Sequence, residues 1–516
     1  MKKIKILWAD DEIDILKPQI MFLQNKGYEV VPVSNGYDAI ERCREDTFDV
    51  VFLDESMPGI TGLETLPRIK DLHSNLPVVM ITKNEAEHIM EDAIGAQITD
   101  YLIKPVNPNQ ILLTLKKIID NKRLVSEATQ QGYQQEFSRI FSAIQTGLDH
   151  REWVDLYKKL IYWELELEST QTEEMQGILT LQKKEANTEF FKFVSKNYYS
   201  WAQNKGDVPT MSHTLFRDKI FPAMNPEVSN FVVLIDNLRF DQWKMIQPIL
   251  SEVFKFISED AFYSILPTAT HYSRNAIFAG MMPSDIERRF PDFWKNDAEE
   301  GGKNLHEADF LAEQLKRLGH TYKHSYIKIT NHADGAQLAD NMLNLLHNRL
   351  NVIVYNFVDM LSHARTEMEV LKELASDEAA YRSITRSWFL HSPLWQALRR
   401  LEDKKVNIII TTDHGTIRVQ QPAKVVGDRN TTSNLRYKHG KNMQYSPREV
   451  FEVRKPIDAR LPTPNVSSAF IFAREDLFFA YPNNYNHYVN YYKNTFQHGG
   501  LSLEEMIVPV VRFTNK

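Results

Sequence analysis

Hydrophobic and polar residues alternate in blocks along the first 120 residues. Five apolar runs have the length and the β-branched content of strands, and they lie at 4–10, 29–35, 48–54, 77–82 and 100–105. Between them, apolar residues recur at helical spacing at 13–25, 37–46, 61–73 and 85–94. Strands that alternate with helices form a parallel sheet covered by helices on both faces. The pattern therefore predicts an α/β domain over residues 1–120.

The pattern changes between residues 121 and 207, which are rich in Gln and Glu and keep apolar residues at helical spacing. A helix that begins near Pro108 meets no Pro or Gly before Gly132, so we expect it to continue from the first domain into this connector. Further on, five apolar residues form a stripe with steps of three and four. We favour a helical bundle that buries this stripe internally, since a dimerising coiled coil needs a longer register. The stripe consists of Trp153, Leu156, Leu160, Trp163 and Leu167.

The α/β character returns over residues 208–516. The runs FVVLID (231–236), NVIVYNFVD (351–359) and VNIIITTDHG (406–415) are continuously apolar before they reach an aspartate. Continuous runs are typical of strands buried on both faces of a parallel sheet. Ligands of such sheets bind at the carboxyl ends of the strands, where these aspartates fall. The fold class is therefore α/β and multidomain.

Composition and charge exclude several classes of protein. Hydrophobic residues at 43% and charged residues at 25% exclude wholesale disorder, and no apolar run approaches the ~20 residues of a membrane span. The first residues, MKKIKILWADDE, lack the features of a signal peptide, and a single cysteine, Cys43, favours a reducing compartment. We expect a soluble, cytoplasmic protein. Residues 1–120 hold 13 basic and 20 acidic residues and account for the net charge of -7, so no part shows the basic excess of a duplex-DNA binder.

Polar residues end the predicted strands of the first domain. Three carboxylates at one edge of a sheet make a hard-oxygen site for Mg²⁺, and an acid there can attack a phosphoryl donor. One aspartate at a strand end is usually a cap or a turn residue, but the whole order, with DESMPG at 54–59, is difficult to obtain by chance. The residues are Asp10 and Asp11 after the first strand, Asp54 after the third, Thr82 after the fourth and Lys104 after the fifth.

This order resembles the receiver domain of two-component systems. The resemblance covers residues 1–120 and implies a flavodoxin-like fold with Asp54 as the phosphoacceptor. It also implies that Asp10, Asp11, Asp54 and the backbone of Ser56 hold Mg²⁺. The same resemblance makes Thr82 and Tyr101 the switch pair and makes Lys104 the contact to phosphate.

The last domain carries a second ordered set of polar residues. The spacing D-x-x-x-H, here Asp359 and His363, places both groups on one side of a helical turn. Asp413 and His414 follow a buried strand, before a glycine that permits a tight turn. His498 lies in the turn QHGG. Asp and His without Cys suit Zn²⁺ or Mn²⁺. A lone histidine in a turn is more often solvated, and D-x-x-x-H alone is weak evidence, so the inference depends on the order of the whole set.

That order resembles the alkaline phosphatase superfamily, in particular its PglZ branch. The segment LPTATHYSR (266–274) resembles the nucleophile segment, with Thr270 as the attacking residue and a metal ligand. In the phosphomonoesterases of the superfamily an arginine follows the nucleophile, whereas His271 follows it here; Arg274 is a candidate to replace that arginine in binding substrate. The difference favours phosphodiester chemistry. The resemblance implies two Zn²⁺ ions, one held by Asp359, His363 and His498 and the other by Asp236, Asp413 and His414.

A basic segment lies between DHG and HGG. Residues 418–441 hold six Lys and Arg and one acid, Asp428. We interpret the segment as a candidate for gripping phosphates, with Arg436 and Lys438 as candidate substrate-binding residues, and a solvated mobile loop is an equal alternative.

The order of receiver, helical-bundle connector and PglZ-type effector resembles that of response regulators of type IX protein secretion. This resemblance implies a sensor histidine kinase, an inner-membrane secretion component and an extracytoplasmic-function sigma factor as partners. It also implies zinc-dependent phosphodiesterase activity on cyclic or linear oligonucleotides and a homodimer on phosphorylation. One alternative is an interaction module in which zinc only shapes a protein-binding surface. A DNA-binding transcription factor ranks last, because no helix-turn-helix pattern or basic stripe follows the receiver.

Overall fold

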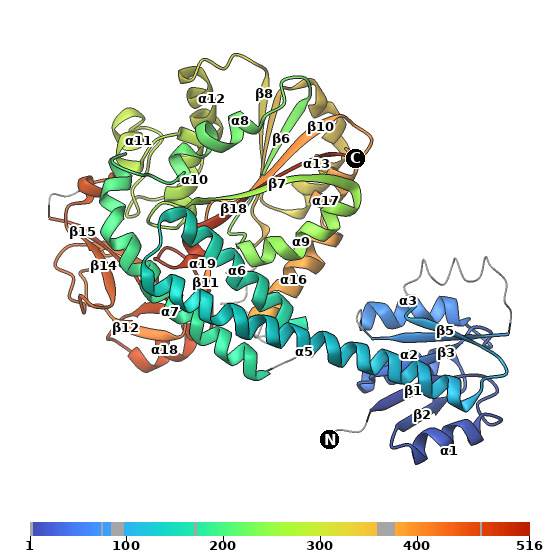
Figure 1. Ribbon diagram of the computed structural model, residues 1–516. Coiled ribbons are helices and arrows are strands. Elements are labelled where there is room, and N and C mark those ends of the chain that lie inside the picture. The colour runs from blue at the N-terminus through green and yellow to red at the C-terminus, as the bar shows by residue number, and fades with distance from the viewer. Residues whose placement is uncertain (1–3, 74–75, 84–97, 170–172, 359–376, 465–466) are drawn as a thin grey trace. The chain divides into compact units, whose positions relative to one another are not determined.

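The computed structural model describes the chain except residues 1–3, 74–75, 84–97, 170–172, 359–376 and 465–466. It forms two compact units, residues 1–132 and 133–516 (Figure 1). The domain boundaries that we predict at 120 and 207 stay predictions, since the units divide at Gly132.

Unit 1 is a parallel sheet of five strands in the order β2-β1-β3-β4-β5. Helices α1 and α5 pack on one face and α2 and α3 on the other. This arrangement confirms the flavodoxin-like fold; the helix predicted at 85–94 lies outside the described residues. The strands are β1 (Lys5–Ala9), β2 (Glu29–Val33), β3 (Val50–Asp54), β4 (Val78–Thr82) and β5 (Asp100–Ile103), and the helices α1 (Lys17–Asn25), α2 (Gly36–Glu45) and α3 (Gly62–Leu72).

The first helix of unit 1 begins later than its apolar pattern predicts. It starts at Lys17, not at residue 13, and Pro18 lies in its first turn. Proline lacks a backbone N–H and suits the first turn of a helix but not its interior. The expected start at residue 13 is therefore wrong by about one turn.

Helix α5 crosses the boundary between the two units, and two further long helices follow it in unit 2. Helix α5 is a single helix over Pro108–Thr146, as its unbroken pattern predicts, and α6 (His150–Ser169) and α7 (Glu173–Ala202) follow it. Stripe residues such as Trp153 and Leu160 are buried in the same hydrophobic core as the sheet of unit 2. The stripe therefore packs against the effector as well as against its neighbouring helices.

The centre of unit 2 is a sheet of six strands in the order β7-β18-β10-β6-β9-β8. Strands β9, β6 and β10 are parallel, as their continuous apolar runs predict, and β8 extends this parallel part of the sheet, whereas β18 pairs antiparallel with both β10 and β7. The sheet is therefore mixed rather than wholly parallel. Its strands are β6 (Ser229–Ile235), β7 (Phe254–Tyr263), β8 (His324–Ile329), β9 (Leu350–Tyr355), β10 (Val406–Thr411) and β18 (Ile507–Asn515).

Helices cover both faces of this sheet (Figure 1). On one face α10 packs against α11 and α12, and on the other α9, α16, α17 and α13 contact one another in turn. These helices are α9 (Phe240–Val253), α10 (Thr270–Ala279), α11 (Pro283–Arg289), α12 (Glu307–Arg317), α13 (His332–Asn341), α16 (Glu378–His391) and α17 (Pro393–Arg399); α8 (Phe221–Ala223) precedes β6.

The basic segment 418–441 belongs to a group of small sheets beside the main one. Strands β11 and β17 pair, β12 pairs with β16, and β13, β15 and β14 form a third sheet. The alternative of a mobile loop is wrong for Arg418, for Gln421–Lys424 and for Tyr437–Gly440, because these parts of the segment lie in paired strands. The elements are β11 (Ile417–Arg418), β12 (Gln421–Lys424), β13 (Tyr437–Gly440), β14 (Val450–Val453), β15 (Ala469–Ala473), β16 (Leu477–Ala480), α18 (Tyr485–Tyr492), β17 (Phe496–Gln497) and α19 (Leu503–Met506).

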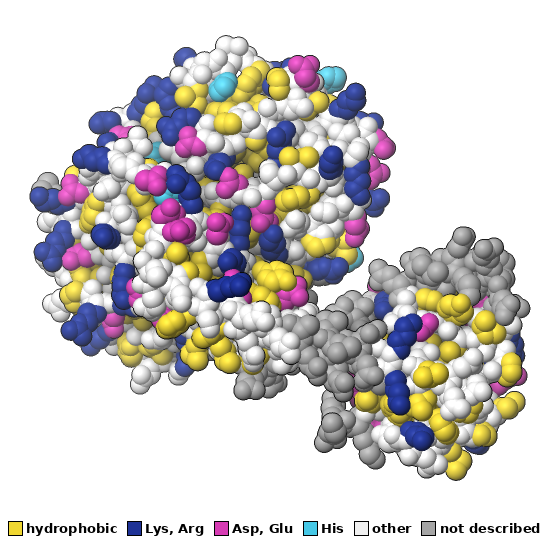
Figure 2. Space-filling view, in the orientation of Figure 1, with side chains coloured by type: hydrophobic (Ala, Val, Ile, Leu, Met, Phe, Trp, Pro, Cys, Tyr) yellow, Lys and Arg dark blue, Asp and Glu magenta, His cyan; other side chains and the backbone are white. Residues whose placement is uncertain are grey.

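The surface carries charges of both signs. Lys and Arg side chains are interspersed with Asp and Glu over the visible face of unit 2 (Figure 2). Within the described part of the chain, no helix is both long enough and apolar enough to cross a membrane.

Candidate functional sites

The acidic cluster predicted for the receiver is present in unit 1. One carboxylate oxygen each from Asp10, Asp11 and Asp54 lies within 4.8 Å of the others. Asp10 and Asp54 are buried, and Nζ of Lys104 lies 2.9 Å from Oδ2 of Asp10 and 3.0 Å from Oδ1 of Asp54. The pKa of Asp54 is raised to about 6, mainly by burial. The hydrogen bond from Lys104 opposes this rise, and the negative charge of Asp10 adds to it. Three hard carboxylates beside one lysine fit a divalent cation such as Mg²⁺.

The predicted switch residues flank this cluster. The Thr82 hydroxyl donates a hydrogen bond to Oε2 of Glu55, the residue after Asp54, and the Tyr101 ring is 41% exposed. Ser56 is exposed two residues beyond Asp54. A Cβ on Gly62 would lie 2.3 Å from the carbonyl oxygen of Asp54, so α3 can begin this close to the site only with glycine there.

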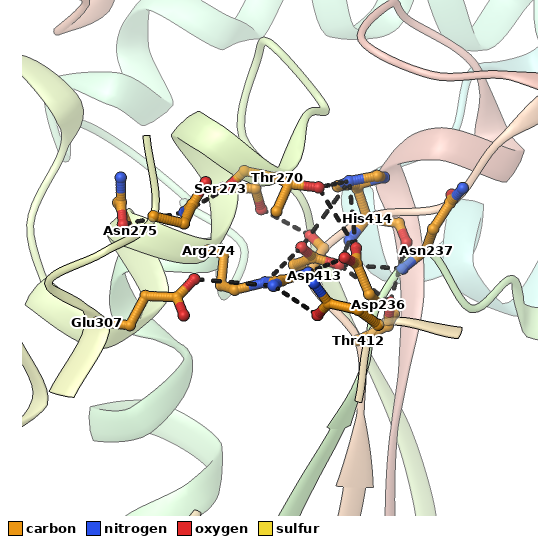
Figure 3. A network of polar contacts seen from close by, with 12 residues as sticks. Asp236, Asn237, Thr270, Ser273, Arg274, Asn275, Glu307, Thr412, Asp413 and His414 are labelled. Carbon is orange, nitrogen blue, oxygen red and sulfur yellow. Dashed lines mark hydrogen bonds and ion pairs between the residues drawn. The ribbon is translucent and has the colours of Figure 1, made fainter. Parts of the chain in front are cut away.

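The strand ends of unit 2 bring three predicted zinc ligands together. Asp236 follows β6, and Asp413 and His414 follow the adjacent parallel strand β10. One ligand atom from each lies within 4.8 Å of the others, and all three residues are buried (Figure 3). His414 Nδ1 lies 3.0 Å from the carbonyl of Gly415, to which only an Nδ1–H can donate, so Nε2 faces the carboxylates as an acceptor.

The glycine after His414, Gly415, is required for a different reason from the expected tight turn. A Cβ there would lie 2.0 Å from the carbonyl oxygen of Glu504. The chain therefore needs glycine because another backbone passes close to it. In QHGG, by contrast, Gly499 has φ of 117° and does form the predicted turn.

Thr270 begins helix α10 directly opposite the three ligands. Its Oγ1 lies 3.3 Å from Oδ1 of Asp236 and 3.1 Å from Nε2 of His414 (Figure 3). It lines a pocket of about 820 Å³ together with His271, Asn304, Tyr437 and other residues. The predicted nucleophile thus lies between the candidate ligands and an open cavity.

His498 is the fourth predicted zinc ligand that the structure brings to this place. Its imidazole ring stacks on that of His414 with centroids 4.4 Å apart. The two rings meet because β11, which follows His414, pairs with β17, which precedes His498. Asp359 and His363 lie outside the described residues. The described donors, two carboxylates and two imidazoles around a hydroxyl, fit a zinc centre by their chemistry.

Arg274 does not lie where a substrate-binding arginine would. It is fully buried, and its guanidinium pairs with Asp236 and Asp413 (Figure 3). Burial alone would raise the pKa of Asp413, but the charge of Arg274 and further contacts, among them the backbone N–H of Asn237, together outweigh burial and hold the pKa below its ordinary value. Because its donors are engaged by protein carboxylates, the structure does not support Arg274 as a residue that binds substrate.

The two basic candidates of segment 418–441 are also buried. Nε and Nη2 of Arg436 donate to the two carboxylate oxygens of Glu505 at 3.0 and 2.6 Å. Lys438 donates to the carbonyl of Thr432 at 2.8 Å, and burial lowers its pKa to about 7. Neither presents a charge to solvent, so the structure does not support either as a grip for substrate phosphates.

His271, the residue after Thr270, has a carboxylate partner. Its Nδ1 lies 3.1 Å from Oδ1 of Asp297, whose other oxygen accepts a hydrogen bond from Tyr272. Burial would raise the pKa of Asp297, but its interactions with His271 and the hydrogen bond from Tyr272, among other causes, together outweigh burial and lower the pKa. His271 also stacks on Trp294.

Several residues of the site carry no motif that the sequence analysis uses. Asn356 follows β9 directly, so its position at a strand end was a usable signal. Glu307 at the start of α12 and Asp297 in a loop have no such signal, and only the fold brings them near α10. Asn237, at φ of 62°, turns the chain after Asp236 and donates its N–H to Asp413.

Family comparisons agree with this geometry. Residues 215–513 match the family described as the BREX system PglZ alkaline phosphatase-like domain. Because this match spans more than half of the chain, the chain belongs to the PglZ family. Residues 123–202 match the PorX response regulator linker domain, and residues 6–116 match the response regulator receiver domain. The chain is therefore a PorX-type response regulator with a PglZ effector domain.

Individual relatives match only part of the chain. The chain is 33% identical over 123 residues to the transcriptional regulatory protein ZraR of Klebsiella oxytoca, which covers 24% of this chain and 28% of that protein. It is 31% identical over 115 residues to ResD of Bacillus subtilis, with 22% and 48% covered. The chain thus spans less than half of the length of these curated relatives. The chemotaxis protein CheY4 of Vibrio cholerae is 29% identical with a TM-score of 0.22, covering 23% of this chain and 99% of that structure.

Proposed function

We propose that this protein is a response regulator phosphorylated on Asp54 by a sensor histidine kinase, with Mg²⁺ bound in the receiver. The protein acts in the cytoplasm. Its effector hydrolyses phosphodiesters, in cyclic or linear oligonucleotides, through Thr270 and two zinc ions. This activity regulates type IX protein secretion. An inner-membrane secretion component and an extracytoplasmic-function sigma factor are the further partners.

The observation that carries the proposal is the position of the Thr270 hydroxyl. It lies within 3.3 Å of both Asp236 and His414 and lines the pocket. A threonine hydroxyl is a poor nucleophile unless its proton is removed or its oxygen is bound by a metal. Bound zinc would supply that Lewis acidity through the Asp and His ligands.

The residues around Thr270 account for the chemistry of attack. Asp236 Oδ1 and His414 Nε2 are the acceptors that face the hydroxyl proton. The oxygen then forms a bond to phosphorus while the bond to the leaving nucleoside oxygen breaks, and that oxygen takes up a proton. Water replaces threonine in a second displacement, which releases the phosphate ester and restores the hydroxyl.

The choice of a diester depends on which cations face the pocket. A terminal phosphate carries two charges and is usually held by a guanidinium fork, whereas a diester carries one charge. Among the described residues that line the pocket, the one arginine is Arg274, and it pairs with Asp236 and Asp413. The lysines of the lining are Lys328, which pairs with Glu307, and Lys303, which donates to the carbonyls of Asn296 and Glu299. His271 is held by Asp297. Because the one guanidinium of this described lining is engaged by aspartates, the lining supports diester over monoester hydrolysis.

Substitution of Thr270 tests the proposal. We expect Thr270→Ala to lower diesterase kcat by at least about 10³-fold with fold and zinc content unchanged, because the hydroxyl takes part only in the chemical step. Thr270→Ser retains the attacking oxygen, and we expect activity within about tenfold of the parent. Turnover of phosphodiester substrates and zinc content by elemental analysis are the measurements. Thr180→Ala, on the exposed face of α7, is the control for general effects.

The same variants separate the enzyme from a protein-interaction module. If Thr270→Ala turns over substrate at the parent rate, or if the parent keeps full activity after exhaustive chelation, the proposed site is wrong. If Thr270→Ala loses turnover but keeps full regulatory output in cells, zinc-shaped binding of a sigma factor or secretion component carries the signal instead.

A further inference from the structure

Arg274 lies one helical turn after Thr270 on α10. Side chains four residues apart project from the same face of a helix, so Arg274 points toward the same strand ends as the nucleophile. It is fully buried, although most arginines keep their charged ends in water. Such burial requires partners for its five N–H donors.

The partners of Arg274 are the two aspartates of the candidate metal site. Its Nε donates to Oδ2 of Asp413 at 3.0 Å, and Nη2 pairs with Oδ2 of Asp236. On the far side, Nη1 donates to Oδ1 of Asn356 at 3.1 Å and lies 3.7 Å from Oε1 of Glu307 (Figure 3). The guanidinium therefore bridges the carboxyl ends of three neighbouring strands, β6, β9 and β10.

These contacts determine how each carboxylate is turned. Asp236 uses Oδ2 for Arg274, which leaves Oδ1 3.3 Å from the Thr270 hydroxyl and 3.9 Å from Nε2 of His414. Asp413 is held at both oxygens, because Oδ1 accepts from the backbone N–H of Asn237 at 3.2 Å. Neither carboxylate can rotate without losing a buried charge-assisted hydrogen bond.

We propose that Arg274 is a positioning residue that holds the Asp236 and Asp413 carboxylates in the orientation needed to bind zinc and keeps Oδ1 of Asp236 turned toward the Thr270 hydroxyl. This inference rests on the proposed function and adds a role that substrate contact does not explain. Groups that hydrogen-bond to metal ligands typically contribute 10–100-fold to metal affinity or activity.

Arg274→Gln and Arg274→Lys test the inference. We expect Arg274→Gln to weaken zinc affinity by about 10–100-fold, measured with a competing chelator, and to lower kcat with KM within about threefold of the parent. Arg274→Lys keeps the charge but not the planar fork, so it should recover only part of both. Arg382→Lys is the matched control, because Arg382 is also buried and paired with carboxylates, Asp241 and Glu164, away from Thr270. It should keep parental zinc affinity and kcat.

Glu307→Gln provides a second route if the arginine variants do not fold. It leaves Arg274 in place and removes the negative charge that faces it, so it should weaken zinc affinity in the same direction by less. If Arg274→Gln binds zinc like the parent but raises KM, Arg274 contacts substrate and the inference is overturned. A parent protein that binds no zinc or hydrolyses no diester would instead contradict the proposed function itself.

Discussion

At the scale of single residues, unit 2 pairs most of the charges that it buries. Arg274, Arg382 and Arg436 each contact at least one carboxylate, and breaking such a buried pair typically costs about 3–5 kcal/mol. His213 is different: burial, followed by the charges of Arg217 and Arg460, lowers its pKa to about 4 despite the opposing charge of Asp218. Its neutral form is therefore the one that the fold stabilises.

His213 makes the stability of unit 2 depend on pH. Its folded pKa of about 4 lies below the ordinary value of 6.5, so its contribution is complete above pH 6.5 and is lost as the pH falls toward 4. Between pH 8 and pH 5 we expect the parent to lose about 2 kcal/mol more unfolding free energy than His213→Gln, which does not titrate. Urea unfolding at the two pH values measures this difference. Identical pH dependence in parent and variant would mean that His213 is not buried as neutral imidazole.

The chemistry at single residues was predictable where it lies at strand ends. Asp236, Asp413 and Thr270 could be placed because continuous apolar runs identify parallel strands, whose carboxyl ends share one edge. The role of Arg274 was not predictable, because the sequence of the nucleophile segment is the same whether its arginine faces substrate or protein carboxylates. Glu307 and Asp297 required the fold itself, because no periodic pattern leads to them.

At the scale of elements, helix α7 is attached to α19, whose backbone adjoins the turn after Asp413 and His414. Asn187 of α7 accepts a hydrogen bond from the N–H of Leu503 at 2.8 Å and donates to Oε2 of Glu504 at 3.0 Å. The carbonyl of Glu504 is the one that Gly415 approaches, directly after His414. One side chain of the connector thus contacts the backbone that adjoins the candidate zinc ligands.

Asn187 should contribute strongly to stability because both bonds are buried. We expect Asn187→Ala to lower the free energy of unfolding by about 2–4 kcal/mol, since it leaves a buried N–H and a carboxylate without their partner. Asn197→Ala on the same helix is the control, because Asn197 bonds only to Phe193 of its own helix, and it should cost less than about 1 kcal/mol. Denaturant unfolding compares the two. Equal losses of unfolding free energy in the two variants would show that the hydrogen bonds of Asn187 do not hold α7 to Leu503 and Glu504.

Element types were more predictable than their surroundings. The five strands of the receiver sheet, strands β6, β9 and β10 of unit 2 and the unbroken helix α5 follow from their apolar patterns, whereas α1 starts at Lys17 because proline outweighs the apolar period. The connector stripe was recognisable as buried, but a spacing of three and four does not say which surface covers it. Residues 418–441 carry too many charges to be recognised as paired strands from their composition.

At the scale of the whole molecule, helix α5 contributes to both units as one helix, Pro108–Thr146. In the receiver, Thr82 and Tyr101 are the side chains that we expect to move when Asp54 is phosphorylated. Thr82 donates to Glu55 rather than to Asp54, and Tyr101 is 41% exposed. A phosphoryl group on Asp54 adds charge and three strong acceptors, which compete with Glu55 for the Thr82 hydroxyl.

We expect this competition to couple phosphorylation to assembly and activity. When Thr82 turns to the phosphoryl group, Tyr101 can move inward and repack the face that includes β5 and the start of α5. Beryllofluoride with Mg²⁺, which mimics the phosphoryl group, should therefore shift the parent from monomer to dimer and change its diesterase activity, whereas Asp54→Ala should do neither. Light scattering and substrate turnover on both proteins are the measurements. A parent that stays monomeric with unchanged turnover at saturating beryllofluoride would show that phosphorylation acts through partner binding instead.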